Sequence, residues 1–116
     1  MQTNAQANVT DSPTQSENLK DNEFRVAAVP AGSALLVGDA AVFNVAAVGL
    51  CATQAKCTHR EGPLNEGRLD GSTVTCPWHG SQFNVCTGAV LRGPATEPVK
   101  AYRVIVEGEV GRVEKA

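Results

Sequence analysis

The sequence contains few aromatic side chains, and this limits the core that it can build. Aromatic residues make up only 4% of the 116 residues, so valine, alanine and leucine must supply most of the buried surface. Valine favours β-strands over helices. A chain of this length forms one domain. A domain with so few large core residues often gains stability from a bound metal.

The sequence also lacks the features of membrane proteins, nucleic-acid-binding proteins and enzymes. No apolar segment approaches the roughly 18 residues of a membrane-spanning helix, so we expect no membrane association. The formal net charge is −2 and the basic residues are scattered, so we expect no nucleic-acid partner. We find no acid–base pair, activated nucleophile or phosphate-binding loop outside the cysteines and histidines described below. We therefore expect no catalytic residues and no enzymatic activity of the protein alone.

The first 23 residues differ in composition from the rest of the chain. They carry a net charge of −3 and are rich in Asn, Gln, Ser, Thr and Asp. Such a segment buries too little apolar surface to offset the entropy lost on ordering. We therefore expect a disordered tail over residues 1–23 and a folded domain over residues 24–116. The tail has no basic region followed by an apolar segment, so it does not resemble a secretory signal, and we expect a cytoplasmic protein.

From Phe24 onward, Gly, Pro and Asp interrupt the apolar segments at short intervals. This pattern predicts about nine short strands and no convincing helix. The predicted strands cover residues 24–29, 34–37, 40–48, 49–55, 73–76, 82–85, 89–91, 101–107 and 109–114. Residues 60–68 contain two glycines and one proline and are predicted to form a loop. The pattern predicts an all-β domain, either a sandwich or a small barrel.

Both histidines of the chain follow a cysteine closely. His59 lies two residues after Cys57, and His79 lies three residues after Cys76. Thiolate and imidazole are suited to iron–sulfur clusters or zinc, and not to calcium or magnesium. A Rieske [2Fe–2S] centre requires this mixed set, because histidines replace two cysteines on one of its two irons. We therefore predict that the two cysteines bind one iron and that the two histidines bind the other.

The same four residues leave two alternatives open. Two cysteines and two histidines can also form a tetrahedral structural zinc site, which would make the chain a zinc-stabilised interaction domain. Zinc fingers, however, usually place two cysteines before two histidines, whereas here each cysteine is followed by a histidine. The second alternative is that the four residues are unrelated. Chance explains the pattern poorly, because the chain has only two histidines and both follow a cysteine.

The charge of such a cluster predicts a one-electron carrier. A [2Fe–2S] core with two thiolates is neutral when oxidised and carries one negative charge when reduced. Neutral imidazoles place less negative charge on the cluster than thiolates do, so its reduction potential lies above that of all-cysteine ferredoxins.

At these residues the chain resembles the Rieske ferredoxin family. The resemblance covers both cysteine–histidine loops, Thr87-Gly88, and residues 93–95 (Gly-Pro-Ala), and it extends over roughly residues 24–114. It implies the Rieske iron–sulfur fold: small stacked antiparallel sheets with a cluster-binding subdomain whose ligand loops lie at its tip. Residues 93–95 resemble the family's third loop, so Pro94 is expected to cover the cluster. Trp78 is expected either to shield the cluster, to form part of a docking surface, or to pack within its loop.

Two departures from the respiratory and photosynthetic members of that family affect the expected potential. Those members carry an additional cysteine in each ligand loop, and the corresponding positions here are Gly62 and Trp78, so no disulfide between the loops is expected. They also hydrogen-bond the cluster sulfurs through a serine and a tyrosine. Ser81 matches the serine, but Phe83 replaces the tyrosine. The loss of one donor predicts a potential in the lower part of the Rieske range.

This profile resembles the soluble ferredoxins that serve bacterial oxygenases. The resemblance implies a monomeric one-electron carrier that passes electrons from a flavin-containing reductase to a terminal oxygenase. Its contacts with both partners are expected to be transient, over a small interface at the exposed edge formed by His59 and His79. An alternative with the same fold is the small subunit of an NAD(P)H-dependent nitrite reductase. Many of those subunits lack the cluster ligands, so the presence of the ligands favours the carrier.

Two cysteines remain outside the predicted ligand set. Cys51 lies in an apolar segment and is expected to be a buried thiol, and Cys86 lies in the turn after the second ligand loop. A disulfide between them is the lesser alternative, because a reducing cytoplasm opposes it.

Overall fold

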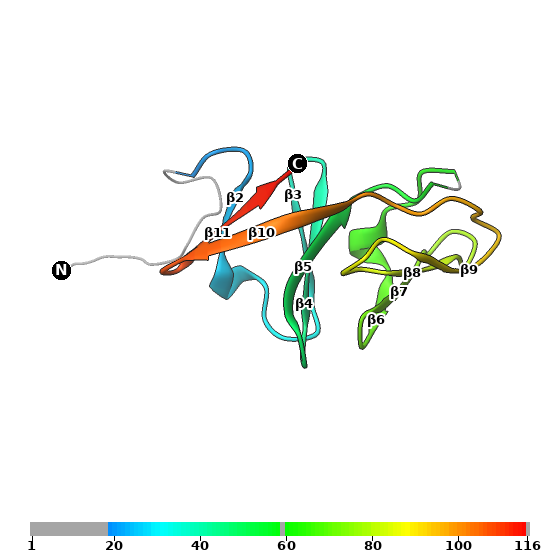
Figure 1. Ribbon diagram of the computed structural model, residues 1–116, viewed down its shortest axis with the longest axis horizontal. Helices are drawn as coiled ribbons and strands as arrows, with labels where there is room; N and C mark the ends of the chain where they lie inside the picture. Colours follow the sequence, from blue (N-terminus) through cyan, green and yellow to red (C-terminus); the bar gives the residue numbers. More distant parts are fainter. Residues whose placement is uncertain (1–18, 59, 116) are drawn as a thin grey trace.

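The computed structural model describes residues 19–58 and 60–115 (Figure 1). Within them the chain forms strands and two 3₁₀-helices but no α-helix. The elements are, in chain order, β2 (Glu23–Arg25), η1 (Val26–Ala28), β3 (Ala34–Val37), β4 (Ala40–Val45), β5 (Gly49–Gln54), η2 (Leu64–Glu66), β6 (Arg68–Asp70), β7 (Thr73–Thr75), β8 (Gln82–Asn84), β9 (Val90–Arg92), β10 (Ala101–Glu107) and β11 (Val110–Glu114). Residues 1–18 of the predicted tail and the predicted ligand His59 lie outside the described residues.

The strands form two antiparallel sheets, which confirms the all-β prediction. The larger sheet has six strands in the order β2-β11-β10-β5-β4-β3, and the smaller has four in the order β6-β7-β8-β9. In Figure 1 the four-stranded sheet lies to the right of the six-stranded sheet, and β10 (orange) runs away from it. The four-stranded sheet is built from the chain between β5 and β10. We call residues 55–100 the inserted subdomain, and both cysteine–histidine loops belong to it.

β4 is buried on both faces, and all of its residues except Asn44 are apolar. Successive side chains of a strand point to opposite faces. Ala41, Phe43 and Val45 pack into one buried cluster together with residues of the inserted subdomain. Ala40 and Val42 pack into a second cluster within the six-stranded sheet. We call the first the inter-sheet core; it joins the two sheets and includes both Cys57 and Cys76.

The strand predictions were most accurate where apolar residues dominate. β3 and β10 have the predicted bounds, whereas the predicted strand 24–29 ends at Arg25 and continues as η1. β6 and η2 lie in the segment predicted to be a loop or a turn. Within β6 only Leu69 is partly buried, so its sequence shows no apolar pattern that predicts a strand. The strand is recognised only by its pairing with β7. No helix in residues 19–58 and 60–115 is long and apolar enough to cross a membrane.

The prediction that Cys51 is a free thiol was wrong. Cys51, in β5, forms a disulfide with Cys86, in the turn between β8 and β9, and their Cα atoms are 5.0 Å apart. This separation lies within the range that a disulfide spans. The prediction relied on the expected compartment of the protein, and the sequence does not show that β5 and this turn face each other. The bond therefore links the six-stranded sheet to the inserted subdomain.

Phe24 anchors the second buried cluster. Its side chain is fully buried, and it lies over Gly111 of β11, where an added Cβ would come within 2.4 Å of the ring. We expect Phe24→Ala to lower the free energy of unfolding by about 3–5 kcal/mol, because it removes a large side chain and leaves a cavity. Urea denaturation of the protein measures this. Val48→Ala is the control, since Val48 is 67% exposed, and its effect is expected to stay within about 0.5 kcal/mol. Equal effects of the two substitutions would show that Phe24 is not a core residue.

Candidate iron–sulfur site

The two cysteine–histidine loops close with the same backbone hydrogen bonds. In the first loop, the Cys57 N–H donates to the Gly62 carbonyl at 2.8 Å, and the Glu61 N–H donates to the Cys57 carbonyl at 3.0 Å. In the second, the Cys76 N–H donates to the Ser81 carbonyl at 2.7 Å, and the Gly80 N–H donates to the Cys76 carbonyl at 3.1 Å. Each cysteine is thus fixed at the start of a six-residue loop.

The loops also share a left-handed residue four positions after the cysteine. These residues are Glu61 in the first loop, with φ 59°, and Gly80 in the second, with φ 81°. The first loop has a second left-handed residue, Arg60, with φ 70°. Non-glycine residues adopt this conformation only where the surrounding structure holds them in it. The two loops therefore share their closing bonds and differ in their turns, just as their cysteine–histidine spacings differ.

The two predicted cysteine ligands are buried thiols in the inter-sheet core. Cys57 is 2% exposed and Cys76 is 1% exposed. Gly62 of the first loop lies against the second loop, because a Cβ added there would lie 2.5 Å from the Cys76 Sγ. The absence of a side chain at Gly62 is therefore what makes room for this sulfur. The fold brings the first loop directly against the thiol of the second.

Of the two predicted histidine ligands, only His79 can be described, because His59 lies outside the described residues. His79 is exposed, in contrast to the buried thiols. Among the described residues, no three His, Cys, Asp or Glu side chains gather around a single metal position.

Ser81 connects the second loop to the segment predicted to cover the cluster. Its side chain is fully buried, and its hydroxyl oxygen accepts a hydrogen bond from the Ala95 N–H at 3.0 Å. The hydroxyl proton remains available for donation to a second acceptor, because the Ala95 bond uses only an oxygen lone pair. Within the third loop Ala95 is buried, whereas Pro94 is exposed.

The two aromatic residues near the loops occupy opposite environments. Phe83 is fully buried in the inter-sheet core and offers no hydroxyl. Trp78 is 57% exposed, and its Cβ and Cγ are the atoms that would lie 3.3–3.4 Å from a Cβ added to Gly62. Gly62 and Trp78, the positions where the respiratory proteins carry their additional cysteines, are therefore neighbours. The Trp78 side chain therefore contacts the first loop through its Cβ and Cγ, while more than half of the residue is exposed to solvent.

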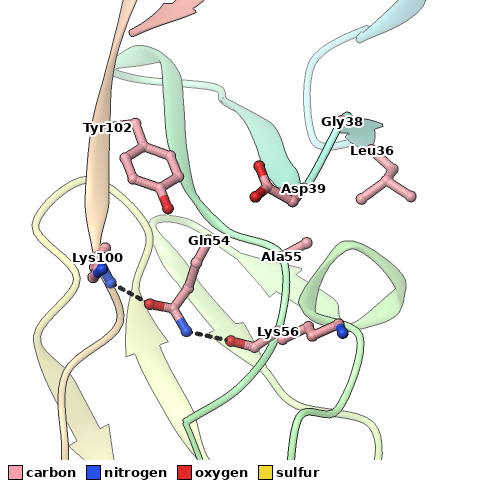
Figure 2. A pocket seen from close by; sticks show the side chains of 8 residues that line it. All are labelled: Leu36, Gly38, Asp39, Gln54, Ala55, Lys56, Lys100 and Tyr102. Carbon is pink, nitrogen blue, oxygen red and sulfur yellow. Dashed lines mark hydrogen bonds between the residues drawn. The ribbon is translucent and has the colours of Figure 1, made fainter. Parts of the chain in front are cut away.

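A pocket of about 560 Å³ lies where the chain enters and leaves the inserted subdomain (Figure 2). It is lined by Leu36, Gly38, Asp39, Gln54, Ala55, Lys56, Lys100 and Tyr102. The Gln54 side chain donates to the Lys56 carbonyl at 2.7 Å and accepts from the Lys100 N–H at 2.8 Å (Figure 2). On the rim, a hydrogen bond from the Lys115 ammonium lowers the pKa of the Asp39 carboxyl. Gln54 therefore ties together the two chain segments that enter and leave the inserted subdomain, next to the start of the first loop.

The residues of the two loops fit a [2Fe–2S] cluster. The buried cysteines supply the soft ligands that such a cluster needs, and His79 supplies an imidazole. The buried Ser81 hydroxyl can donate a hydrogen bond, as groups around cluster sulfurs commonly do. The all-β fold and these loops define the class of iron–sulfur proteins whose cluster is held by paired loops of a small antiparallel domain.

Comparison with known proteins identifies the family within this class. A profile of the Rieske [2Fe-2S] domain matches residues 13–103. The chain belongs to the Rieske [2Fe–2S] domain family, and its cofactor is a Rieske-type [2Fe–2S] cluster. The resemblance and the fold predicted from the sequence are therefore confirmed.

Two of the relatives are named as ferredoxins. Ferredoxin CarAc of Metapseudomonas resinovorans is 50% identical over 60 residues, which cover 51% of this chain and 56% of that protein. The biphenyl dioxygenase ferredoxin subunit of Pseudomonas sp. (strain KKS102) is 47% identical over 85 residues, 69% of this chain and 77% of that protein. The match to CarAc thus spans little more than half of that relative's length.

One structural neighbour is a ferredoxin bound to its oxygenase. It comes from a complex of reduced oxygenase and oxidized ferredoxin in carbazole 1,9a-dioxygenase. The match has a TM-score of 0.72 and 33% identity, and it covers 84% of this chain and 98% of that one.

Proposed function

We propose that this protein is a soluble one-electron carrier that delivers electrons through its Rieske cluster to the terminal oxygenase of a multicomponent dioxygenase system. The observation that carries the proposal is the pair of equivalent loops, each of which begins with a buried cysteine of the inter-sheet core. The relatives support it: one is the biphenyl dioxygenase ferredoxin subunit, and another, 41% identical over 58 residues, is the ferredoxin component of a naphthalene 1,2-dioxygenase system. The structural neighbour from carbazole 1,9a-dioxygenase supports it as well. The protein is not itself an enzyme in this proposal.

The proposed ligands are Cys57 and Cys76 for one iron, and His59 and His79 for the other. When bound, the cluster supplies reversible one-electron chemistry. The chain's own residues set its surroundings. The core around the two thiols excludes water from that side of the site, and the buried Ser81 hydroxyl can donate to a cluster sulfur. The exposed His79 lies on the side that a partner can approach.

The proposed partners are a flavin-containing reductase and a terminal oxygenase, each bound transiently by a cytoplasmic monomer. The complex of a similar ferredoxin with its oxygenase supports the second partner. Trp78 and His79 are adjacent and exposed, and an exposed tryptophan beside a redox site suits a small contact surface. Such an interface is expected to bury less than about 1,200 Å², as weak redox encounters do.

The proposal is tested by optical and EPR spectra of the purified protein before and after dithionite. We expect a red-brown protein that bleaches on reduction and gives a rhombic EPR signal with an average g below the free-electron value. It should then replace the ferredoxin when biphenyl dioxygenase reductase and terminal oxygenase are assayed together. A colourless, EPR-silent protein containing one zinc per chain would contradict the cluster. A normal cluster without electron transfer to any oxygenase would contradict the carrier role.

We expect His79→Cys to retain part of the cluster and to lower its reduction potential by on the order of 100 mV or more, because a thiolate adds negative charge at the iron. A redox titration followed by EPR measures the shift. Trp78→Phe is the control, since it changes the neighbouring side chain without changing the ligand charge. An unchanged potential in a fully loaded His79→Cys protein would show that His79 is not a ligand.

A further inference from the structure

The Cys51–Cys86 disulfide encloses every proposed cluster ligand. The two cysteines are 35 residues apart, and both cysteine–histidine loops lie between them in the sequence. The bond therefore closes a covalent ring that contains the whole ligand set. Among the described residues, the remaining cysteines are the two buried thiols of the site.

The bond also lies at the base of the inserted subdomain. Cys51 pairs with Phe43 of β4, and both cysteines pack against the inter-sheet core. The Cys86 turn is held by Asn84, whose side-chain oxygen accepts the Cys86 N–H at 2.8 Å. On the same turn, the Gly88 carbonyl accepts the Val99 N–H at 2.9 Å. The disulfide is thus a covalent link in a junction that is otherwise held by core packing and a few hydrogen bonds.

Both cysteines are only partly buried, at the edge of the inter-sheet core. We propose that Cys51–Cys86 is a site of thiol–disulfide exchange, and that its reduction weakens the retention of the cluster. The inference about retention rests on the proposed ligands. The reductant is a dithiol: its two thiols lose two electrons and two protons and become a disulfide, while Cys51 and Cys86 each become a thiol. The exchange passes through a mixed disulfide, which the second thiol of the reductant resolves.

Reduction affects the cluster through the freedom of the enclosed segment. A disulfide that closes a loop of this length removes much of the conformational entropy of the open chain. Once the bond is broken, the junction can open locally, and the two loops can separate without complete unfolding. Because the cluster needs ligands from both loops, each such opening exposes it to loss.

The test uses the cluster-loaded protein under anaerobic conditions, with dithiothreitol as the dithiol. Alkylation followed by peptide mass spectrometry reports the state of Cys51 and Cys86, the decay of visible absorbance reports cluster loss, and thermal unfolding reports stability. The matched control is the double variant Cys51→Ala/Cys86→Ala, which shows any direct effect of dithiothreitol on the cluster. The wild-type protein with and without dithiol keeps the test decisive if that variant does not fold.

We expect dithiothreitol to free both cysteines, to lower the midpoint of thermal unfolding by about 10 °C or more, and to accelerate cluster loss about tenfold. The double variant should lose its cluster at the fast rate without the dithiol and show no further response to it. The inference is overturned if both cysteines are already alkylated in untreated protein, or if the dithiol leaves the bond intact. It is also overturned if the bond is reduced while cluster loss stays within twofold of the untreated rate. A missing Rieske spectrum in untreated protein would contradict the proposed ligands as well, whereas a normal spectrum that ignores reduction contradicts this inference alone.

Discussion

Replacing Cys57 by alanine is expected to give a folded protein without a [2Fe–2S] cluster. The Cys57 thiol is buried in the inter-sheet core at the start of the first loop, so neither solvent nor a mobile side chain can replace it. No spare cysteine is available among the described residues either, because Cys51 and Cys86 are bonded to each other. An iron left with one thiolate cannot keep the cluster, since each iron takes two protein ligands.

The measurement is iron and acid-labile sulfide per chain, together with the visible absorbance and EPR spectra. We expect all of these signals to be lost from Cys57→Ala. Thr58→Ala is the matched control in the same loop. The Thr58 hydroxyl donates to the Glu97 carbonyl at 2.7 Å, so this variant loosens the loop without removing a proposed ligand. It should keep most of its cluster. A Cys57→Ala protein that is red-brown and contains two irons per chain would disprove the ligand assignment.

The sequence identified the candidate ligands because their chemistry is local. Thiolate and imidazole in short loops are informative without any knowledge of the fold. The all-β class was predictable for a similar reason, since valine-rich segments between glycines and prolines favour strands.

The remaining features depend on contacts between distant segments and were not predictable. The disulfide joins β5 to a turn of the other sheet, and no local pattern shows that the two lie close together. Gln54 gives no sequence signal for its role, because its partners Lys56 and Lys100 are ordinary exposed residues whose backbone groups make the bonds. Similarly, the matching hydrogen bonds of the two loops involve backbone atoms, which a comparison of their side chains does not reveal.

Replacing Gly62 by alanine is expected to lower cluster affinity by about 10–100-fold, the range typical of changes beside metal ligands, with little effect on the stability of the cluster-free protein. The added Cβ would lie 2.5 Å from the Cys76 Sγ and 3.3 Å from the Trp78 Cγ. In the cluster-free protein the thiol can rotate away from the methyl group, because a cysteine side chain turns about one bond. If Cys76 is a ligand as proposed, an iron would hold this sulfur in the loaded protein, and the methyl group would have to displace either the sulfur or the first loop.

The matched control is Gly93→Ala in the third loop. A Cβ added there would meet nothing closer than 3.8 Å, and neither glycine has a left-handed φ, so the two substitutions differ mainly in the contact with Cys76. Iron content after reconstitution measures cluster affinity, and urea denaturation of the cluster-free proteins measures stability. Equal destabilisation of the cluster-free Gly62→Ala and its loaded form would indicate a general packing defect. Selective loss of the cluster would instead indicate that the Cys76 sulfur cannot move away from the added methyl group once iron is bound. A cluster ligand is fixed in this way, whereas an ordinary buried cysteine can rotate.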